Sequence, residues 1–286
     1  MFDVTSPYDP KPVAAGRMQR ARGRVTLGVS GRADGGTGLD VLFQAGAAKA
    51  RLPAVYDHAG VDAVLINTAG GLTGGDEFQV DCAVGAGAFL RVTAQASEKI
   101  YRATAGSKPA RVENRVQVAA GASLEWLPQD MILFDGASLS RLLEVRLAAS
   151  SRFLGLEMVV FGRSAMGEVV RRGCLVDRWR VWRDGALVYA EDARLEGDIA
   201  AHLARPAVAG GALAALTGIY QGPALEDVRE TIRSVPRPDG VEANASLMRG
   251  LVAFRALGAS SDALRRWVAE IYAALAGLSL PRAWSI

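Results

Sequence analysis

The feature that most constrains this chain is a two-residue alternation of apolar and polar side chains, which recurs between about residue 23 and residue 193. In "ARVENRVQV", Val112, Val116 and Val118 share one face, and charged or polar residues occupy the other. An alternation of this period is typical of a strand that is buried on one side. The segments "RLLEVRL" and "FLGLEMVVFG" behave similarly, and the second is apolar almost throughout, which favours burial on both faces. The sequence therefore predicts a mainly β protein.

Turn and helix signals complete this pattern. Asp184-Gly185 in "WRVWRDGALVYAED" predicts the tight turn of a β-hairpin. After residue 206, "GPALEDVRETIRSV" and "SSDALRRWVAEIYAALAG" carry helical spacing, the second with a serine cap and a terminal glycine. Between them, "NASLMRGLVAFRAL" spaces Leu247, Leu251 and Phe254 as one face of a helix would. We therefore expect a few helices, mostly toward the C-terminus.

The domain organisation follows from these two patterns. A chain of 286 residues is long enough for one large domain, and no structureless linker separates the two kinds of pattern. We expect an N-terminal tail over residues 1–22 and a single domain over residues 23–286. Within that domain, a β body extends to about residue 205 and a helical end follows after about residue 223.

Composition excludes several classes of function. The 33 basic and 30 acidic residues nearly balance, and no long basic run is present to neutralise phosphates, so nucleic acid is not an expected partner. The start "MFDVTSPYDP" lacks the charged and apolar regions of a signal peptide. No stretch reaches the roughly 18 uncharged apolar residues that a membrane span needs. The sequence predicts a cytoplasmic protein without a membrane segment.

A glycine-rich stretch, "LINTAGGLTGGD", raises the question of a phosphate site. A P-loop needs a lysine after its last glycine, whereas Gly70, Gly71, Gly74 and Gly75 are followed here by Asp76. A dinucleotide fingerprint must open a helix, but the following "DEFQVDCAV" predicts a strand. The favoured interpretation is a structural loop whose glycines allow positive φ angles or a close backbone approach.

Three further polar segments interrupt the apolar strands. They are "TAQASEKIYRA", "EWLPQDMILFDGA" and "FGRSAMGE", with Glu98, Tyr101, Asp130 and Glu168 as their candidate side chains. A solvated loop would explain the first of these segments equally well. Because the chain has only two histidines and contains neither H-x-H nor C-x-x-C, we expect no catalytic triad, no tight metal site and no tightly bound cofactor. Oxygen ligands remain, and they hold hydrated divalent cations weakly.

In order and spacing, these four segments resemble the signature segments of the urease accessory protein family UreD, called UreH in some species. The resemblance extends from about residue 23 to residue 286 and includes the C-terminal "PRAW". It implies a β-helix-like stack of many short strands and a chaperone that is not an enzyme. It also implies binding to apo-urease and to the accessory proteins UreF and UreG, of which UreG is a nickel-carrying GTPase, with transient handling of Ni²⁺. The alternative is a metal- or phosphate-dependent enzyme that uses the glycine-rich loop and Asp76.

Two expectations about sites follow. First, the glycine loop directs Asp76 into a water-filled internal passage that guides Ni²⁺, together with Glu98, Tyr101, Asp130 and Glu168. The alternative is that these groups form structural salt bridges with arginines such as Arg91, Arg102 or Arg163.

The second expectation concerns partner binding. The helical end offers the aromatic residues Phe254, Trp267 and Trp284 as anchors for a partner, with UreF the expected one, because aromatic side chains dominate interface energetics. The alternative is that they pack on the protein's own core.

Overall fold

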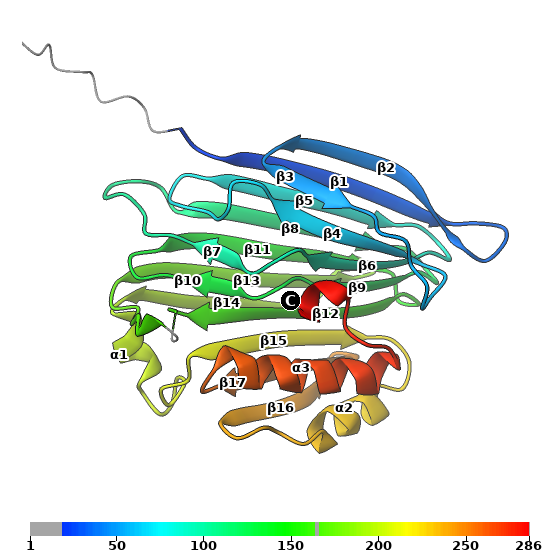
Figure 1. The fold of residues 1–286 in the computed structure, drawn as a ribbon. Coiled ribbons are helices and arrows are strands. Elements are labelled where there is room, and N and C mark those ends of the chain that lie inside the picture. The colour runs from blue at the N-terminus through cyan, green and yellow to red at the C-terminus, as the bar shows by residue number, and fades with distance from the viewer. Residues whose placement is uncertain (1–18, 164–165, 286) are drawn as a thin grey trace, which may run out of the picture.

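The computed structural model describes residues 19–163 and 166–285, and it consists mainly of two β-sheets (Figure 1). The seven-stranded sheet has the order β14-β13-β11-β8-β5-β1-β2. Its strands are β14 (Ala186–Gly197), β13 (Gly173–Arg183), β11 (Ser138–Leu147), β8 (Ala110–Val118), β5 (Glu77–Val84), β1 (Arg22–Gly31) and β2 (Thr37–Gly46).

The ten-stranded sheet has the order β16-β17-β15-β12-β9-β6-β4-β3, with β10 and β7 branching from β12. Its strands are β16 (Val241–Met248), β17 (Leu251–Gly258), β15 (Ala214–Gln221), β12 (Arg152–Phe161), β9 (Ser123–Leu127), β6 (Phe89–Ala94), β4 (Val61–Asn67), β3 (Ala48–Arg51), β10 (Met131–Leu133) and β7 (Glu98–Ile100). The helices are α1 (Ile199–Leu203), α2 (Leu225–Ser234) and α3 (Ser261–Ala276), and a 3₁₀ turn follows at Arg282–Ser285.

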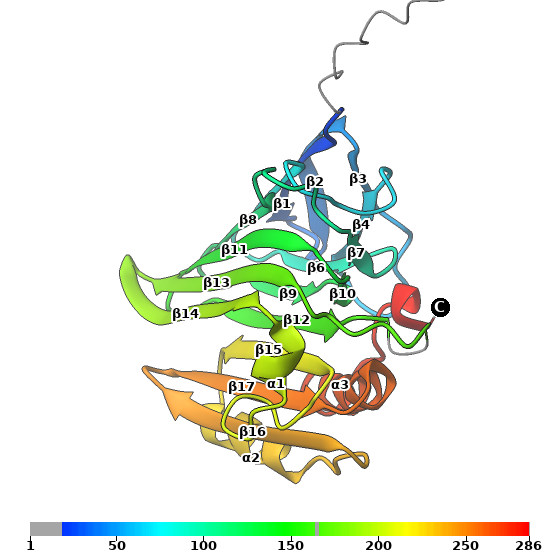
Figure 2. The ribbon, with the colours of Figure 1, turned by 90° about the vertical axis from the view of Figure 1, so that its left-hand side faces the viewer.

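From β4 to β13 the chain passes back and forth between the two sheets. Successive strands of one sheet are therefore parallel neighbours: β5, β8, β11 and β13 in the seven-stranded sheet, and β4, β6, β9 and β12 in the other. Antiparallel strands flank this coiled region on both sides. The two sheets face each other when the molecule is viewed from its end (Figure 2). This arrangement confirms the predicted mainly β, β-helix-like stack.

Three groups of buried apolar side chains hold the layers together. The central cluster lies between the sheets and includes Leu27, Leu90, Val116, Leu143 and Trp179. The helix-side cluster joins the other face of β12, β15 and β17 to α2 and α3 and includes Leu156, Leu216, Ile232, Leu264 and Trp267. The end cluster lies beside β7, β10 and α1 and includes Ile100, Leu133, Leu139, Val159 and Ile199.

Most of the predicted elements are present. Residues 110–118 form β8, β12 is buried on both faces, and Asp184 and Gly185 form the hairpin turn between β13 and β14 with positive φ angles of 46° and 81°. The side chain of Ser260 accepts a hydrogen bond from the backbone N–H of Ala263 at the start of α3, and Gly277 ends that helix in a left-handed conformation.

The helix predicted over residues 244–257 is wrong, because these residues form most of the β16–β17 hairpin. Arg249 and Gly250 adopt positive φ angles of 46° and 72°, which reverse the chain. Leu251 and Phe254 lie on opposite faces of β17, so they belong to different clusters rather than to one helical face. The helical end therefore also contains two strands, β16 and β17, which extend the ten-stranded sheet.

The expected N-terminal tail, residues 1–22, lies outside the described residues as far as residue 18. Its last residue, Arg22, already belongs to β1. The body of the fold thus begins one residue before the expected boundary.

Candidate functional site: a cavity between the sheets

The four polar segments meet at one end of the molecule, beside the end cluster. Leu72 of the glycine-rich loop forms a parallel bridge with Ile100 of β7, and β7 in turn pairs with β10. The fourth segment joins them through Glu168, whose carboxylate accepts a hydrogen bond from the backbone N–H of Asp135 at 3.4 Å. Segments distant in sequence are therefore neighbours, because each lies where a turn of the coil leaves the ten-stranded sheet.

The glycine-rich loop carries the chain from β4 in one sheet to β5 in the other. Gly70, Gly71 and Gly75 have positive φ angles of 77°, 143° and 87°. Gly74 is crowded instead, because an added Cβ would lie 2.2 Å from Oγ of Ser107. These angles and contacts agree with the interpretation of a structural loop whose geometry only glycine tolerates.

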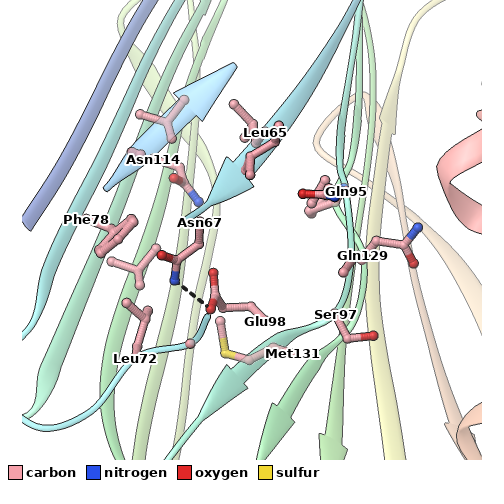
Figure 3. Close-up of a pocket in the computed structure, with 18 of the residues that line it drawn as sticks. Leu65, Asn67, Leu72, Phe78, Gln95, Ser97, Glu98, Asn114, Gln129 and Met131 are labelled. Atoms are coloured by element: carbon pink, nitrogen blue, oxygen red, sulfur yellow. Dashed lines mark hydrogen bonds between the residues drawn. The ribbon is translucent and has the colours of Figure 1, made fainter. Parts of the chain in front are cut away.

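A cavity of about 260 Å³ lies between the two sheets next to this loop (Figure 3). Gly70, Gln95 and Lys99 line it and are exposed, so they mark its open end. Farther in, the walls carry polar side chains from both sheets, and Figure 3 shows the amides of Asn67 and Asn114 between the two layers. The cavity is therefore a partly polar space beside apolar clusters.

Glu98 is the predicted site residue that lines this cavity. Its Oε1 accepts a hydrogen bond from Nδ2 of Asn67 at 2.9 Å, as the dashed line in Figure 3 marks. Burial raises the pKa of the Glu98 carboxyl from its ordinary 4.5 to about 7, and the hydrogen bonds from Asn67 and the Lys99 backbone only partly oppose this rise. Near neutral pH, this side chain exchanges readily between its charged and neutral forms.

A layer of four polar side chains crosses the interior where the central and end clusters meet. This polar layer consists of Asn114, Arg141, Glu157 and Asp177, which come from β8, β11, β12 and β13. Side chains two residues apart in a strand lie on the same face of the sheet. The residues two positions before and two positions after each of these four are apolar or glycine, so each polar side chain interrupts an apolar row. Three of the four, all except Asp177, line the cavity.

Charged contacts organise this layer. Arg141 donates two hydrogen bonds to Asp177, from Nε at 2.8 Å and from a terminal nitrogen at 2.5 Å. Its other terminal nitrogen lies 3.3 Å from Oε2 of Glu157. Trp126 donates its indole N–H to Oε1 of Glu157 at 3.0 Å. Burial raises the pKa of the Glu157 carboxyl, and the Arg141 guanidinium opposes that rise.

Asp76 does not line the cavity, although it is buried. Its carboxylate accepts hydrogen bonds from the backbone N–H groups of Thr73 and Ala21, each at 2.8 Å. Asp76 therefore closes the glycine loop and fixes the start of β1. Both carboxylate oxygens of Asp76 are turned toward backbone N–H donors, so the structure places Asp76 in the loop and not in the cavity wall that the sequence led us to expect.

Tyr101 and Glu168 lie outside the cavity walls. Tyr101 is 39% exposed, and its hydroxyl donates to the backbone carbonyl of Gly70 at 3.1 Å. Glu168 pairs with Arg163 at 2.8 Å, and this hydrogen bond lowers the pKa of the Glu168 carboxyl. For Glu168, the structure shows the alternative that the sequence left open, a structural salt bridge.

Asp130 is also held in an ion pair. Arg265 of α3 contacts its Oδ1 at 2.5 Å, and Ser97 donates a hydrogen bond to the same oxygen at 2.6 Å. Its neighbour Gln129 lines the cavity, whereas Asp130 does not. Four carboxylates and one phenol were expected to line one passage. The structure places Glu98 in the cavity wall and the other four side chains elsewhere.

Comparison with known proteins gives this geometry its context. The sequence model described as "UreD urease accessory protein" matches residues 21–285, nearly the whole chain. The chain belongs to the UreD family. Its relatives include a urease accessory protein UreD of Rhizobium rhizogenes, which is 44% identical over 274 residues that cover 96% of this chain and 98% of the relative.

Two further UreD proteins show the same extent of similarity. The urease accessory protein UreD of a Methylobacterium species is 44% identical over 273 residues, which cover 94% of this chain and 96% of the relative. That of Xanthobacter autotrophicus is 41% identical over 285 residues, covering 98% and 96%. The UreD family consists of accessory proteins of urease, so this chain is not an enzyme, and the alternative of a phosphate- or metal-dependent enzyme built on Asp76 is set aside.

The structure corrects the choice of interface residues in this UreD family member. Phe254 and Trp267 are 1% and 0% exposed in the helix-side cluster, so neither can anchor a partner on the surface. Trp284 is half-buried. Its indole N–H donates to the carbonyl of Leu127 at 3.1 Å, and the guanidinium of Arg265 lies 5.0 Å from its ring centre. All three aromatic side chains pack on the protein itself.

Sequence reasoning missed the polar layer of this UreD chain, although a signal was present. In "ARVENRVQV", Asn114 falls on the same face as Val112 and Val116, so it breaks the apolar row. Arg141 breaks the row that contains Leu139 and Leu143 in the same way. A polar residue on the apolar face of a strand indicates an interior site, because burial without a partner is unfavourable.

Within residues 19–163 and 166–285, no three His, Cys, Asp or Glu side chains gather closely enough to hold a metal ion. In the same part of the chain, no helix is long and apolar enough to cross a membrane.

Proposed function

We propose that this chain is a scaffold for urease maturation, which binds apo-urease and partners of the UreF and UreG kind and lets Ni²⁺ pass through the cavity between its sheets. The observation that carries this proposal is a cavity that contains an ionisable carboxylate, Glu98, in a protein of the UreD family. The names of the relatives associate them with urease and leave the route of the metal open.

The chemistry of the cavity suits an ion that stays hydrated. Its walls offer amide and carboxylate oxygens from Asn67, Glu98, Asn114 and Glu157, which are hard ligands of the kind that hold hydrated divalent cations. Histidine and cysteine, which bind nickel and its neighbours tightly, are absent from the residues that line the cavity. Its volume accommodates several water molecules. Such a space favours transit of the ion over storage.

The test is a urease operon that lacks its own gene for this protein and is complemented by the chain or by its variants. Glu98→Gln retains the hydrogen bond from Asn67 and removes the charge, so we expect normal assembly with urease and a lower nickel content per urease. Glu168→Gln is the matched control, because it removes a carboxylate outside the cavity. We expect this control to leave the nickel content unchanged. Full nickel content with Glu98→Gln would refute the passage.

The binding of a UreF-like partner at the helical end needs a test that leaves the core intact. Truncation after Gly258 would remove α3, which contributes Leu264 and Trp267 to the helix-side cluster, and would expose that cluster. Arg266 and Glu270 lie on the exposed side of α3 instead. Reversing both charges should weaken capture of the partner and leave thermal unfolding unchanged. Undiminished capture by this variant would place the partner elsewhere.

A further inference from the structure

The polar layer is asymmetric in how its two carboxylates are neutralised. Asp177 receives two hydrogen bonds from Arg141 and lies beside it on the neighbouring strand, in matching register. Glu157 comes from the opposite sheet, and its contact with Arg141 is a 3.3 Å ion pair. Its Oε2 receives no hydrogen bond from any residue that the structure describes. Arg141 therefore satisfies Asp177 fully and Glu157 only in part.

The incompletely satisfied group is the one that meets the cavity. Glu157 and Arg141 line the cavity, whereas Asp177 does not. Glu157 is only 3% exposed, and its carboxylate has one hydrogen bond, from Trp126, and one ion pair, with Arg141, so that Oε2 is buried without a hydrogen-bond donor. A buried ion cluster is seldom the most stable solution for a core, since apolar side chains of similar size often serve better. The layer thus has a feature that stability alone does not explain.

A divalent cation in the cavity would meet both members of this pair. Oε2 of Glu157 attracts the ion, while the Arg141 guanidinium repels it and competes for the same oxygen. Because Arg141 is also held by two hydrogen bonds to Asp177, it cannot move away without leaving a second buried carboxylate unpaired. The ion can therefore bind only one carboxylate, and a fixed positive charge lies beside that carboxylate. The affinity of the site for the ion stays low.

We propose that Arg141 is the residue that keeps the cavity a transit site: it neutralises Asp177 and competes with a divalent cation for Glu157, so that the ion is released onward. This inference rests on the proposed passage of Ni²⁺. It assigns the release of the ion to a residue that does not itself bind it.

The experiment measures Ni²⁺ binding to the purified full-length chain by titration calorimetry, with circular dichroism to establish folding. The main variant combines Arg141→Met with Asp177→Asn, which removes one positive and one negative charge and leaves the net charge of the layer unchanged. We expect this variant to bind Ni²⁺ about tenfold more tightly, because Glu157 loses its competitor. We also expect its binding to depend more steeply on pH, because without Arg141 burial raises the pKa of the Glu157 carboxyl further. Adding Glu157→Gln to the same background should return the affinity to that of the original chain.

A second variant, Arg141→Lys, guards against misfolding of the first. Lysine keeps the charge but is a single point donor that cannot hold Asp177 by a planar fork while contacting Glu157. We expect a smaller rise in Ni²⁺ affinity, about threefold, with folding retained. An affinity equal to that of the original chain in whichever of the two variants folds would overturn the role of Arg141.

The two proposals fail in different ways. Normal nickel content of urease with Glu98→Gln refutes the passage itself. An impaired Glu98→Gln together with unchanged Ni²⁺ binding by the Arg141 variants refutes only the role of Arg141 in release.

Discussion

Replacing Glu98 by glutamine should change how the stability of the protein depends on pH. Burial raises the pKa of Glu98 to about 7 in the folded protein, whereas in the unfolded chain it stays near 4.5. Between these values the folded state binds more protons than the unfolded state, so the free energy of unfolding falls as pH rises. Below about pH 4.5 both states are protonated, and the contribution of the neutral carboxyl is fully present.

The size of the effect follows from the same two values. At 1.36 kcal/mol for each pH unit between the folded and unfolded pKa, charging Glu98 destabilises the fold by at most on the order of 3 kcal/mol above pH 7. Glutamine is neutral at every pH and keeps the contact with Asn67. We therefore expect the stability of Glu98→Gln relative to the original chain to increase between about pH 4.5 and pH 7 and to level off above that.

Urea denaturation followed by tryptophan fluorescence at a series of pH values measures this difference. Glu168→Gln is the control, because its salt bridge with Arg163 lowers the pKa of Glu168, so that side chain is charged in both states above about pH 5.5. Its difference from the original chain should be constant over the same range. If the curve for Glu98→Gln is equally flat, then Glu98 ionises as it does in water, and the interior character assigned to the cavity is wrong.

Three further outcomes are expected from the packing and the loop geometry. Trp267→Ala should destabilise the protein by about 3–5 kcal/mol in chemical denaturation, because the indole is fully buried, and Trp284→Ala should cost less than half as much; equal losses would contradict the assigned burial. Gly71→Ala should lower the free energy of unfolding by about 1–3 kcal/mol, because Gly71 has a φ of 143° and crowded surroundings. Gly70→Ala should lower it by about 1 kcal/mol, because there is open space around Gly70. The reverse order would refute this account of the loop. Arg265→Met should release the C-terminal turn and make it the first site of limited proteolysis, since this side chain joins that turn to the connection between β9 and β10. An unchanged digestion pattern would count against that role.

The strands of this fold could be predicted because their alternation is a local property. The alternation within residues 110–118 is enough to predict a strand with one buried face. The backbone preferences of Asp184 and Gly185 are enough to predict a turn. The hairpin at residues 241–258 was missed for the opposite reason, because Arg249-Gly250 is not among the commonest turn pairs. Its apolar spacing also satisfied a helix as well as two strands.

The candidate site was less predictable, because its residues come from different turns of the coil and meet only in the folded protein. Glu98 could be singled out as a polar residue between apolar strands, but Asp76 and Asp130 have the same local appearance and proved to be held by backbone N–H groups and by Arg265. Whether a carboxylate is paired or faces a cavity is decided by residues far away in the sequence. Asn114 and Arg141 are the exceptions, since their positions on apolar faces were visible in the alternation itself.

The order in which the chain is synthesised gives the helix-side cluster a further consequence. Leu154, Leu156 and Val160, on the outer face of β12, belong to the same buried cluster as the apolar side chains of α3, which is translated about 100 residues later. At typical rates of synthesis, α3 is completed roughly 5–20 s after β12, so the apolar face of β12 lacks these packing partners on the ribosome during that time. A nascent chain with this apolar face exposed is prone to associate with other apolar surfaces. We therefore expect ribosome-bound chains that end before Ser261 to require a chaperone, whereas the finished chain does not.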